Sequence, residues 1–235
     1  MAFLYGGLYM YERIPIKTHI ITEKDDILDV VYKYTKDIAD KGDLISIAES
    51  VVAITQGRAY LPENIKIGFW AKILCKFASK NGSLTSPYGM QCAINEVGIV
   101  RILIASFIGG IGKIFGKKGW FFLIAGRKVA LIDDVAGTMP PYHKHIVLGP
   151  ANPDKVCNSI KERMGIDAVI IDANDLHKAD CVGASEGVNK KYVERFFIDN
   201  PSGNDEQQTP IVIVKNYNVW TESLKTEKGD KIALS

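Results

Sequence analysis

Acidic residues follow two of the apolar segments in this 235-residue chain. Asp133 and Asp134 follow one apolar run, residues 129–132. Asp172 and Asp175 follow a second apolar run, residues 168–171. If both runs are buried strands, their ends can bring carboxylates together in one crevice. Carboxylate oxygens are the hard ligands that Mg²⁺ and Mn²⁺ prefer, and such a metal neutralises phosphate oxygens.

A third acidic stretch, which contains Glu206 and Gln207, precedes the apolar residues 211–214. Each acidic group taken alone is also typical of an ordinary turn, because Asp and Asn bond to their own local backbone. The sequence leaves open which aspartate of each pair faces a cavity. The three acidic groups together predict a divalent-metal site.

Two cations are candidates for binding a phosphate or a substrate carboxylate. Lys17 ends an extended segment, and Arg58 follows Gly57 and can form a bidentate fork. Glu49 and Ser50 come directly after an expected strand, where a backbone turn can present amides to an anion. The alternative for each cation is a solvated surface charge.

The common nucleotide-binding motifs are absent. Neither Gly-Lys pair, at 112–113 and 116–117, is followed by the Ser or Thr of a Walker loop. Gly110, Gly112 and Gly116 miss the dinucleotide fingerprint by one position, so we expect them to allow close helix packing instead. The sequence has no Gly-x-Ser-x-Gly nucleophile motif. His143 and His145 are too few for a zinc site, so surface positions are expected.

Composition places the chain among ordinary globular proteins, with 47% hydrophobic and 24% charged residues. A formal net charge of +2 does not favour nucleic acid or a membrane as the main partner. The four cysteines form no Cys-x-x-Cys pair and predict reduced thiols of a cytoplasmic protein. The most apolar stretch, residues 102–112, is shorter than the roughly 20 residues a spanning helix needs.

Periodicity and end signals predict alternating helices and strands. Residues 11–21 are expected to be extended. The expected strands are residues 44–48, 145–148, 168–171 and 210–214, together with a hairpin of residues 120–124 and 129–132. The first expected helix is capped by Thr22 and ends at residues 41–42, and the second covers residues 67–79. A third begins at Ser86 and Pro87 and is interrupted at Gly98. Further helices are expected over residues 100–115, 153–164 and 189–198. Residues 172–180 are expected to form a polar loop. This order favours a mixed α+β fold over a doubly wound one.

Several of these segments resemble the F420-0:gamma-glutamyl ligase family. Similar segments are residues 14–17 with 25–27, 41–45, 51–58, 116–126, 132–133, 174–175 and 209–213. The resemblance covers roughly residues 14–215 and predicts one domain over residues 1–218, with a charged tail over 219–235. It implies an α+β fold with mainly antiparallel sheets, flanking helices and a homodimeric assembly.

The resemblance also implies a GTP-dependent ligase that uses Mg²⁺ or Mn²⁺. Such an enzyme joins glutamate to a small-molecule carboxylate acceptor such as the coenzyme F420 precursor. The implied metal ligands are Asp133, Asp175 and Glu206. The implied nucleotide-binding residues are Ile14, Pro15, Ile16, Lys17, Glu49, Ser50 and Arg58.

Two alternatives stay open because fold likeness does not determine function. One is a relative that acts on another acceptor or with another nucleotide. The other is a nucleotide- or metabolite-binding protein without catalysis. The chain departs from the family pattern at residues 48–50, 135–136 and 176–180, which leaves the acceptor undetermined.

Overall fold

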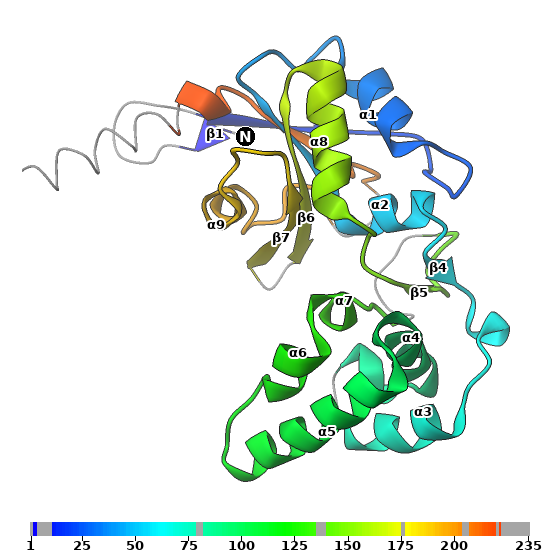
Figure 1. Ribbon diagram of the computed structural model, residues 1–235. Coiled ribbons are helices and arrows are strands. Elements are labelled where there is room, and N and C mark those ends of the chain that lie inside the picture. The colour runs from blue at the N-terminus through cyan, green and yellow to red at the C-terminus, as the bar shows by residue number, and fades with distance from the viewer. Residues whose placement is uncertain are drawn as a thin grey trace, which may run out of the picture. The chain divides into compact units, whose positions relative to one another are not determined.

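The computed structural model divides the chain into two compact units (Figure 1). Unit 1 comprises Met1–Thr55 and Ala151–Ser235, and unit 2 comprises the intervening Gln56–Pro150. Unit 2 is thus an insertion in the chain of unit 1. The residues that the structure describes are 2–3, 11–78, 82–134, 140–174, 177–203, 207–219 and 221.

Unit 1 is built on a six-stranded sheet with the order β1-β2-β8-β3-β6-β7. The strands are β1 (Ala2–Phe3), β2 (Tyr11–Ile16), β3 (Leu44–Ala48), β6 (Asp167–Asn174), β7 (Lys178–Ala184) and β8 (Ile211–Val214). Only β3 and β6 run parallel, and the other four pairings are antiparallel. The α+β class with mainly antiparallel sheets is therefore confirmed.

Helices cover both faces of this sheet. The helices of unit 1 are α1 (Ile27–Thr35), α2 (Glu49–Thr55), α8 (Pro153–Met164) and α9 (Lys190–Val193), which continues into η4 (Glu194–Phe196). Val169 and Ile171 pack against Phe196 in one core cluster. Ile170 pairs with Gly183, and a Cβ on Gly183 would meet Pro153, so α8 lies on the opposite face. Burial on both faces explains why β8 is apolar throughout.

Unit 2 is mainly helical and has its own core. Its elements are β4 (Ala59–Tyr60), η1 (Pro62–Asn64), α3 (Phe69–Leu74), η2 (Cys75–Phe77), η3 (Ser83–Thr85), α4 (Pro87–Val97), α5 (Ile99–Ile114), α6 (Trp120–Ala125), α7 (Arg127–Ala130) and β5 (Ile146–Val147). Met90, Ile102 and Ile146 are fully buried in this core. Short strands β4 and β5 pair antiparallel.

Glycines let α5 and α6 approach closely. A Cβ on Gly112 would lie 3.1 Å from the Trp120 ring, and one on Gly109 would lie 2.9 Å from Cβ of Phe121. The predicted packing role is thus confirmed for Gly112. Gly110 has no neighbour within 4 Å of such a Cβ, and Gly116 instead occupies a left-handed turn at φ 66°.

Three local predictions were wrong. Residues 120–132 form α6 and α7 rather than a hairpin, with Gly119 and Gly126 at positive φ at their ends. Residues 172–174 end β6 and residues 178–180 begin β7, where a polar loop was expected. Helix α1 is capped by Asp26, whose carboxylate accepts from the amide of Leu28 at 2.7 Å, and Thr22 lies in a preceding turn.

The predicted thiols and the predicted cap of α4 agree with the structure. All four cysteines are buried and none forms a disulfide. The Ser86 hydroxyl accepts from the Gly89 amide at 3.0 Å, so Ser86 caps α4 as expected. Among the described residues no single helix has the length and apolarity to cross a membrane. Helices α4 and α5 have that length and apolarity only when taken together, and the pair is bent by 117°.

Gly109 and Gly110 offer a matched test of this packing. We expect Gly109→Ala to lower the unfolding free energy by about 1–3 kcal/mol, because α6 must shift away from the new methyl group. Gly110→Ala should raise it by about 0.5–1 kcal/mol through helix propensity. Urea unfolding followed by tryptophan fluorescence measures both, since Trp70 and Trp120 lie in unit 2. Equal effects of the two variants would contradict the close α5–α6 contact.

Candidate functional site

One edge of the unit 1 sheet gathers the ends of three strands. Ile211, which begins β8, pairs with Ile16 on one side and with Ile47 on the other. Ala48 at the end of β3 pairs with Ile171 of the parallel strand β6. The carboxyl ends of β2, β3 and β6 therefore lie along the same edge, which is where open sheets commonly bind ligands.

Four of the predicted nucleotide-binding residues of unit 1, namely Ile16, Lys17, Glu49 and Ser50, lie at this edge. Ile14, Pro15 and Ile16 lie on β2, and Lys17 is exposed just beyond its end. Glu49 and Ser50, both partly buried, are the first residues of α2 directly after β3. Two segments far apart in sequence are thus placed side by side, separated only by the start of β8.

Backbone bonds fix the geometry of this edge. The Thr18 amide donates to the Gln208 carbonyl at 3.0 Å, and the Ala48 amide donates to the Pro210 carbonyl at 2.8 Å. The segment before β8 is thereby bonded to the ends of both β2 and β3. Glu206 precedes this segment in sequence and is outside the described residues, whereas Gln207 is the first described residue of the segment.

An ion pair anchors the strand that carries these residues. The Arg13 side chain on β2 is only 6% exposed, and its guanidinium donates to the Phe196 carbonyl at 2.8 Å. A second guanidinium nitrogen donates to a carboxylate oxygen of Asp199 at 2.7 Å. The hydrogen bond from Arg13 lowers the pKa of Asp199 below its ordinary value, against the opposing effect of partial burial.

Asp172 lies in a part of the β6–β7 hairpin that extends beyond the end of β3. It pairs with Asp180 across the two strands, and Asn174 pairs with Lys178. Residues paired in this way point to the same face with Cβ atoms about 5 Å apart, so the two carboxylates repel each other. Sequence reasoning identified Asp172 but missed Asp180, because the second strand was not predicted.

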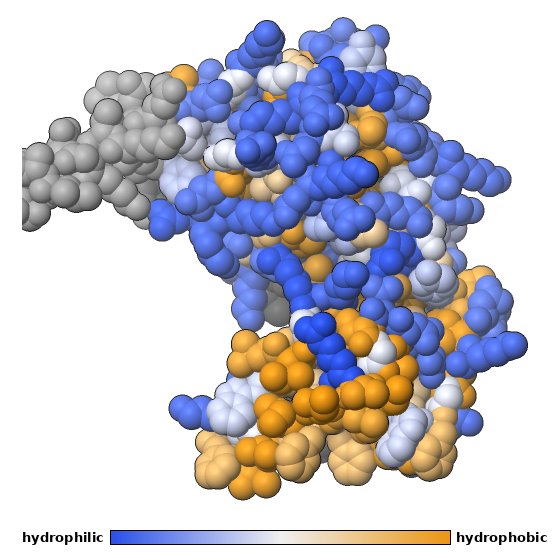
Figure 2. All heavy atoms as spheres, viewed as in Figure 1, coloured by the Kyte–Doolittle hydropathy of each residue, from blue (hydrophilic) through white to orange (hydrophobic). Residues whose placement is uncertain are grey.

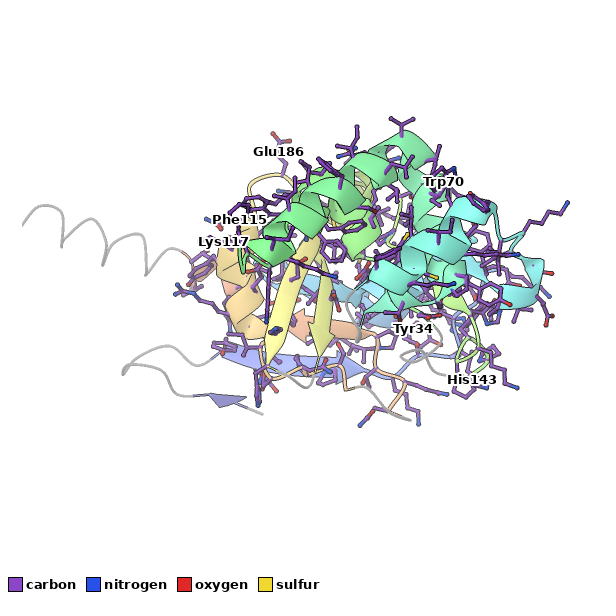
Figure 3. All side chains as sticks on the ribbon, turned by 90° about the horizontal axis from the view of Figure 1, so that it is seen from below. Tyr34, Trp70, Phe115, Lys117, His143 and Glu186 are labelled. Atoms are coloured by element: carbon purple, nitrogen blue, oxygen red, sulfur yellow. The ribbon has the colours of Figure 1, made fainter. Side chains whose placement is uncertain are left out.

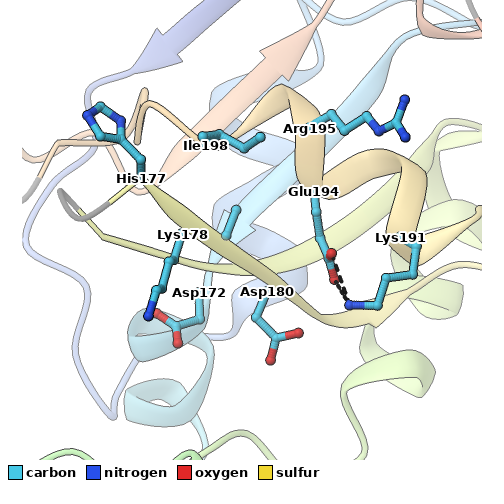
Figure 4. Close-up of a pocket in the computed structure, with 9 residues that line it drawn as sticks. Asp172, His177, Lys178, Asp180, Lys191, Glu194, Arg195 and Ile198 are labelled. Atoms are coloured by element: carbon cyan, nitrogen blue, oxygen red, sulfur yellow. Dashed lines mark hydrogen bonds and ion pairs between the residues drawn. The ribbon is translucent and has the colours of Figure 1, made fainter.

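An open hollow of about 630 Å³ adjoins this hairpin (Figure 4). Its charged lining residues are Asp172, Lys178, Asp180, Lys191, Glu194 and Arg195, accompanied by His177, Ala179 and Ile198. Lys191 and Glu194 form an ion pair at 3.1 Å, and Glu194 also accepts from the Cys181 amide. The hollow therefore carries equal numbers of acidic and basic groups.

Two predicted residues lie in unit 2. Arg58 donates from Nε to the Gly149 carbonyl at 2.6 Å and forms an ion pair with Glu96 at 2.9 Å. It thereby joins the segment after β5 to α4, a structural contact that the sequence did not reveal. Asp133 has an exposed side chain, and its backbone forms a β-bridge with Val147.

Of the three predicted metal ligands, the structure describes only Asp133. Asp175 and Glu206 lie outside the described residues. In the described part of the chain, no three His, Cys, Asp or Glu side chains are arranged to hold a metal ion. His143 is exposed, and the partly buried His145 lies against the Tyr142 ring at 5.0 Å, so these histidines also form no such group there.

Comparison with known families gives a match over most of the chain. The sequence profile of F420-0:gamma-glutamyl ligase matches residues 15–183, a range that runs from β2 through all of unit 2 to β7. Comparison with curated proteins gave no match. The family profile defines an enzyme of the ligase class. The chain belongs to the F420-0:gamma-glutamyl ligase family, as the sequence resemblance predicted.

The Arg13–Asp199 pair predicts a specific pH dependence of stability. A carboxylate whose pKa is lower in the folded state stabilises the folded protein at pH values above its unfolded-state pKa. That contribution is lost as the pH falls through the folded-state pKa. We expect Asp199→Asn to cost about 1–2 kcal/mol at pH 7, discounted because this carboxylate is half exposed.

Urea unfolding of the parent and of Asp199→Asn from neutral pH to below pH 3 measures this contribution. The two midpoints should converge in acid, whereas the control Asp37→Asn, an exposed position in the same unit, should match the parent throughout. A constant gap between parent and Asp199→Asn across the whole range would show that the pair is not electrostatic.

Proposed function

We propose that this protein is a GTP- and divalent-metal-dependent ligase. It would form an amide bond between the amine of glutamate and the carboxylate of a small acceptor such as the F420 precursor. The family match over residues 15–183 is the observation that carries this proposal. The match includes the end of β2, the start of α2, Asp133 and the β6–β7 hairpin.

The sheet edge of unit 1 supports a nucleotide-binding role. Lys17 is exposed there and can meet a phosphate as a point charge, while Glu49 and Ser50 follow the neighbouring strand. Three strand ends held by backbone hydrogen bonds provide a rigid platform. Rigid placement matters because phosphoryl transfer depends mainly on positioning and electrostatic stabilisation.

Carboxylates are the proposed metal ligands, namely Asp133, Asp175 and Glu206. Their oxygens match the chemistry of Mg²⁺ or Mn²⁺, and the exposed side chain of Asp133 stands on a backbone held by the bridge to Val147. A bound metal would supply charge neutralisation at the phosphate oxygens. Holding that metal is the role we propose for these side chains.

The proposed reaction proceeds through two transfers. An acceptor carboxylate oxygen attacks the terminal phosphorus of GTP, and GDP leaves. The glutamate amine then attacks the activated carbonyl carbon, loses a proton, and inorganic phosphate leaves. The thiols take no part, because all four cysteines are buried and burial raises the pKa of Cys92 to about 11.

Phosphate release tests the proposed reaction directly. With GTP and Mn²⁺ present, we expect phosphate to appear only when both glutamate and the F420 precursor are added. Omitting any one component should reduce release to the background rate. If phosphate release does not depend on the precursor, the enzyme acts on another acceptor. If GTP binds but no phosphate is released, the protein binds nucleotide without catalysis.

Asp133 is tested separately by metal-dependent nucleotide binding. We expect Asp133→Asn to weaken Mn²⁺-dependent GTP binding at least about tenfold, because an amide lacks the negative charge of a metal ligand. Titration calorimetry with GTP measures this, with and without Mn²⁺. Glu63→Gln, at an exposed carboxylate of unit 2, is the matched control and should bind as the parent does.

The adjacent aspartate decides how to interpret a negative result. If Asp134→Asn loses binding and Asp133→Asn does not, the ligand is the neighbouring side chain. If both variants bind GTP normally in the presence of Mn²⁺, neither residue belongs to the metal site.

A further inference from the structure

Helix α5 of unit 2 presents an apolar stripe to solvent. Val100, Ile104, Phe107 and Ile114 are 67%, 51%, 70% and 82% exposed. With the partly buried Ile111 they are spaced four, three, four and three residues apart, which is one continuous face of a helix. The opposite side of α5 is also apolar and packs in the core through Ile102 and Ala105. Solvent exposure of such a face needs a physical explanation.

The apolar face continues onto the elements beside α5. Leu123 and Phe122 of α6 are 76% and 44% exposed, and the close contact of Gly109 with Phe121 holds α6 against α5. Phe115 follows α5 and is 70% exposed. Figure 2 shows the broad hydrophobic area over α5, and Figure 3 shows Phe115 beside Lys117 at the C-terminal end of that helix. We call this surface the α5–α6 face.

The segment that carries this face is rich in cations and poor in acids. Residues 65–132 contain ten lysines and arginines but a single acid, Glu96, which is paired with Arg58. The rest of the chain holds nineteen basic and twenty-six acidic residues, so positive charge is concentrated in this segment. Lys117 and Lys118 are exposed in the turn between α5 and α6.

The two cations within α5 leave its outer face apolar. Arg101 donates from Nε to the Ile124 carbonyl at 2.7 Å, at the end of α6. Lys113 donates to the Phe77 carbonyl at 2.7 Å, at the end of η2. Both charges are thus placed at the ends of neighbouring helices rather than over the stripe. That arrangement resembles an amphipathic surface with a basic border.

We propose that the α5–α6 face binds the surface of an anionic lipid membrane. Lipid headgroups supply the negative charge that exposed cations such as Lys117 and Lys118 attract, and the acyl boundary accepts the exposed Phe and Leu side chains. A second copy of the same face would instead bring two cationic borders together. With 16 residues α5 is shorter than a spanning helix, so it lies along the surface rather than across the bilayer.

Vesicle co-sedimentation of the full chain tests this proposal without GTP or substrates, so its outcome is independent of the ligase assay. The probes are vesicles of equal parts phosphatidylglycerol and phosphatidylcholine, compared with phosphatidylcholine alone. We expect binding to the anionic vesicles, weak binding to the neutral ones, and a loss of binding as NaCl rises to about 0.5 M.

Paired variants separate the two contributions. Lys117→Gln with Lys118→Gln should weaken binding about 30-fold, and Phe107→Ser with Leu123→Ser at least about tenfold. The matched controls are exposed residues of unit 1, Lys24→Gln with Lys155→Gln and Ile20→Ser with Ile38→Ser, which should bind as the parent does. The lysine pair lies in an exposed turn and keeps the test valid if the apolar variant fails to fold.

Two results would overturn the proposal. One is equal binding to anionic and neutral vesicles, or no binding to either. The other is a dimer in sedimentation velocity that Phe107→Ser with Leu123→Ser converts to a monomer, which would assign the face to a second copy of this chain.

Discussion

The pairing of β8 with both β2 and β3 is the interaction on which unit 1 depends. The four residues of β8 are fully buried and pair on both sides, with β2 and with β3. Without this strand, β2 would have no partner toward the sheet centre. At the far end of β8, Asp43 accepts from the Lys215 ammonium at 2.6 Å and from the Asn216 amide at 2.9 Å. One short strand thus determines where Lys17 and Glu49 lie relative to each other.

Elements with unambiguous end signals were predicted well from the sequence. Strand β3 has the predicted bounds because it is a short apolar run after a Gly-Asp turn. Ser86 before Pro87 correctly predicted the start of α4, and Gly165 the end of α8. These positions follow from local backbone chemistry, which does not require knowledge of distant partners.

The elements that were missed depend on distant partners. Residues 120–124 are a five-residue apolar run that suits either a strand or a buried helix, and close contact with Gly109 and Gly112 favours the helix. Strand β7 contains polar and small residues, and its pairing with β6 defines it. For the same reason the sequence could identify Asp172 at a strand end but not its cross-strand partner Asp180.

The division of charge along the chain has a structural counterpart. The insertion that forms unit 2 is cationic with an apolar outer face, whereas the remaining chain is acidic and builds the sheet edge. The whole-chain charge of +2 conceals this contrast, because opposite excesses nearly cancel. A net charge is therefore a weak guide to partners when an inserted unit has its own composition. Local charge together with exposed apolar area is the quantity that describes what such a unit can bind.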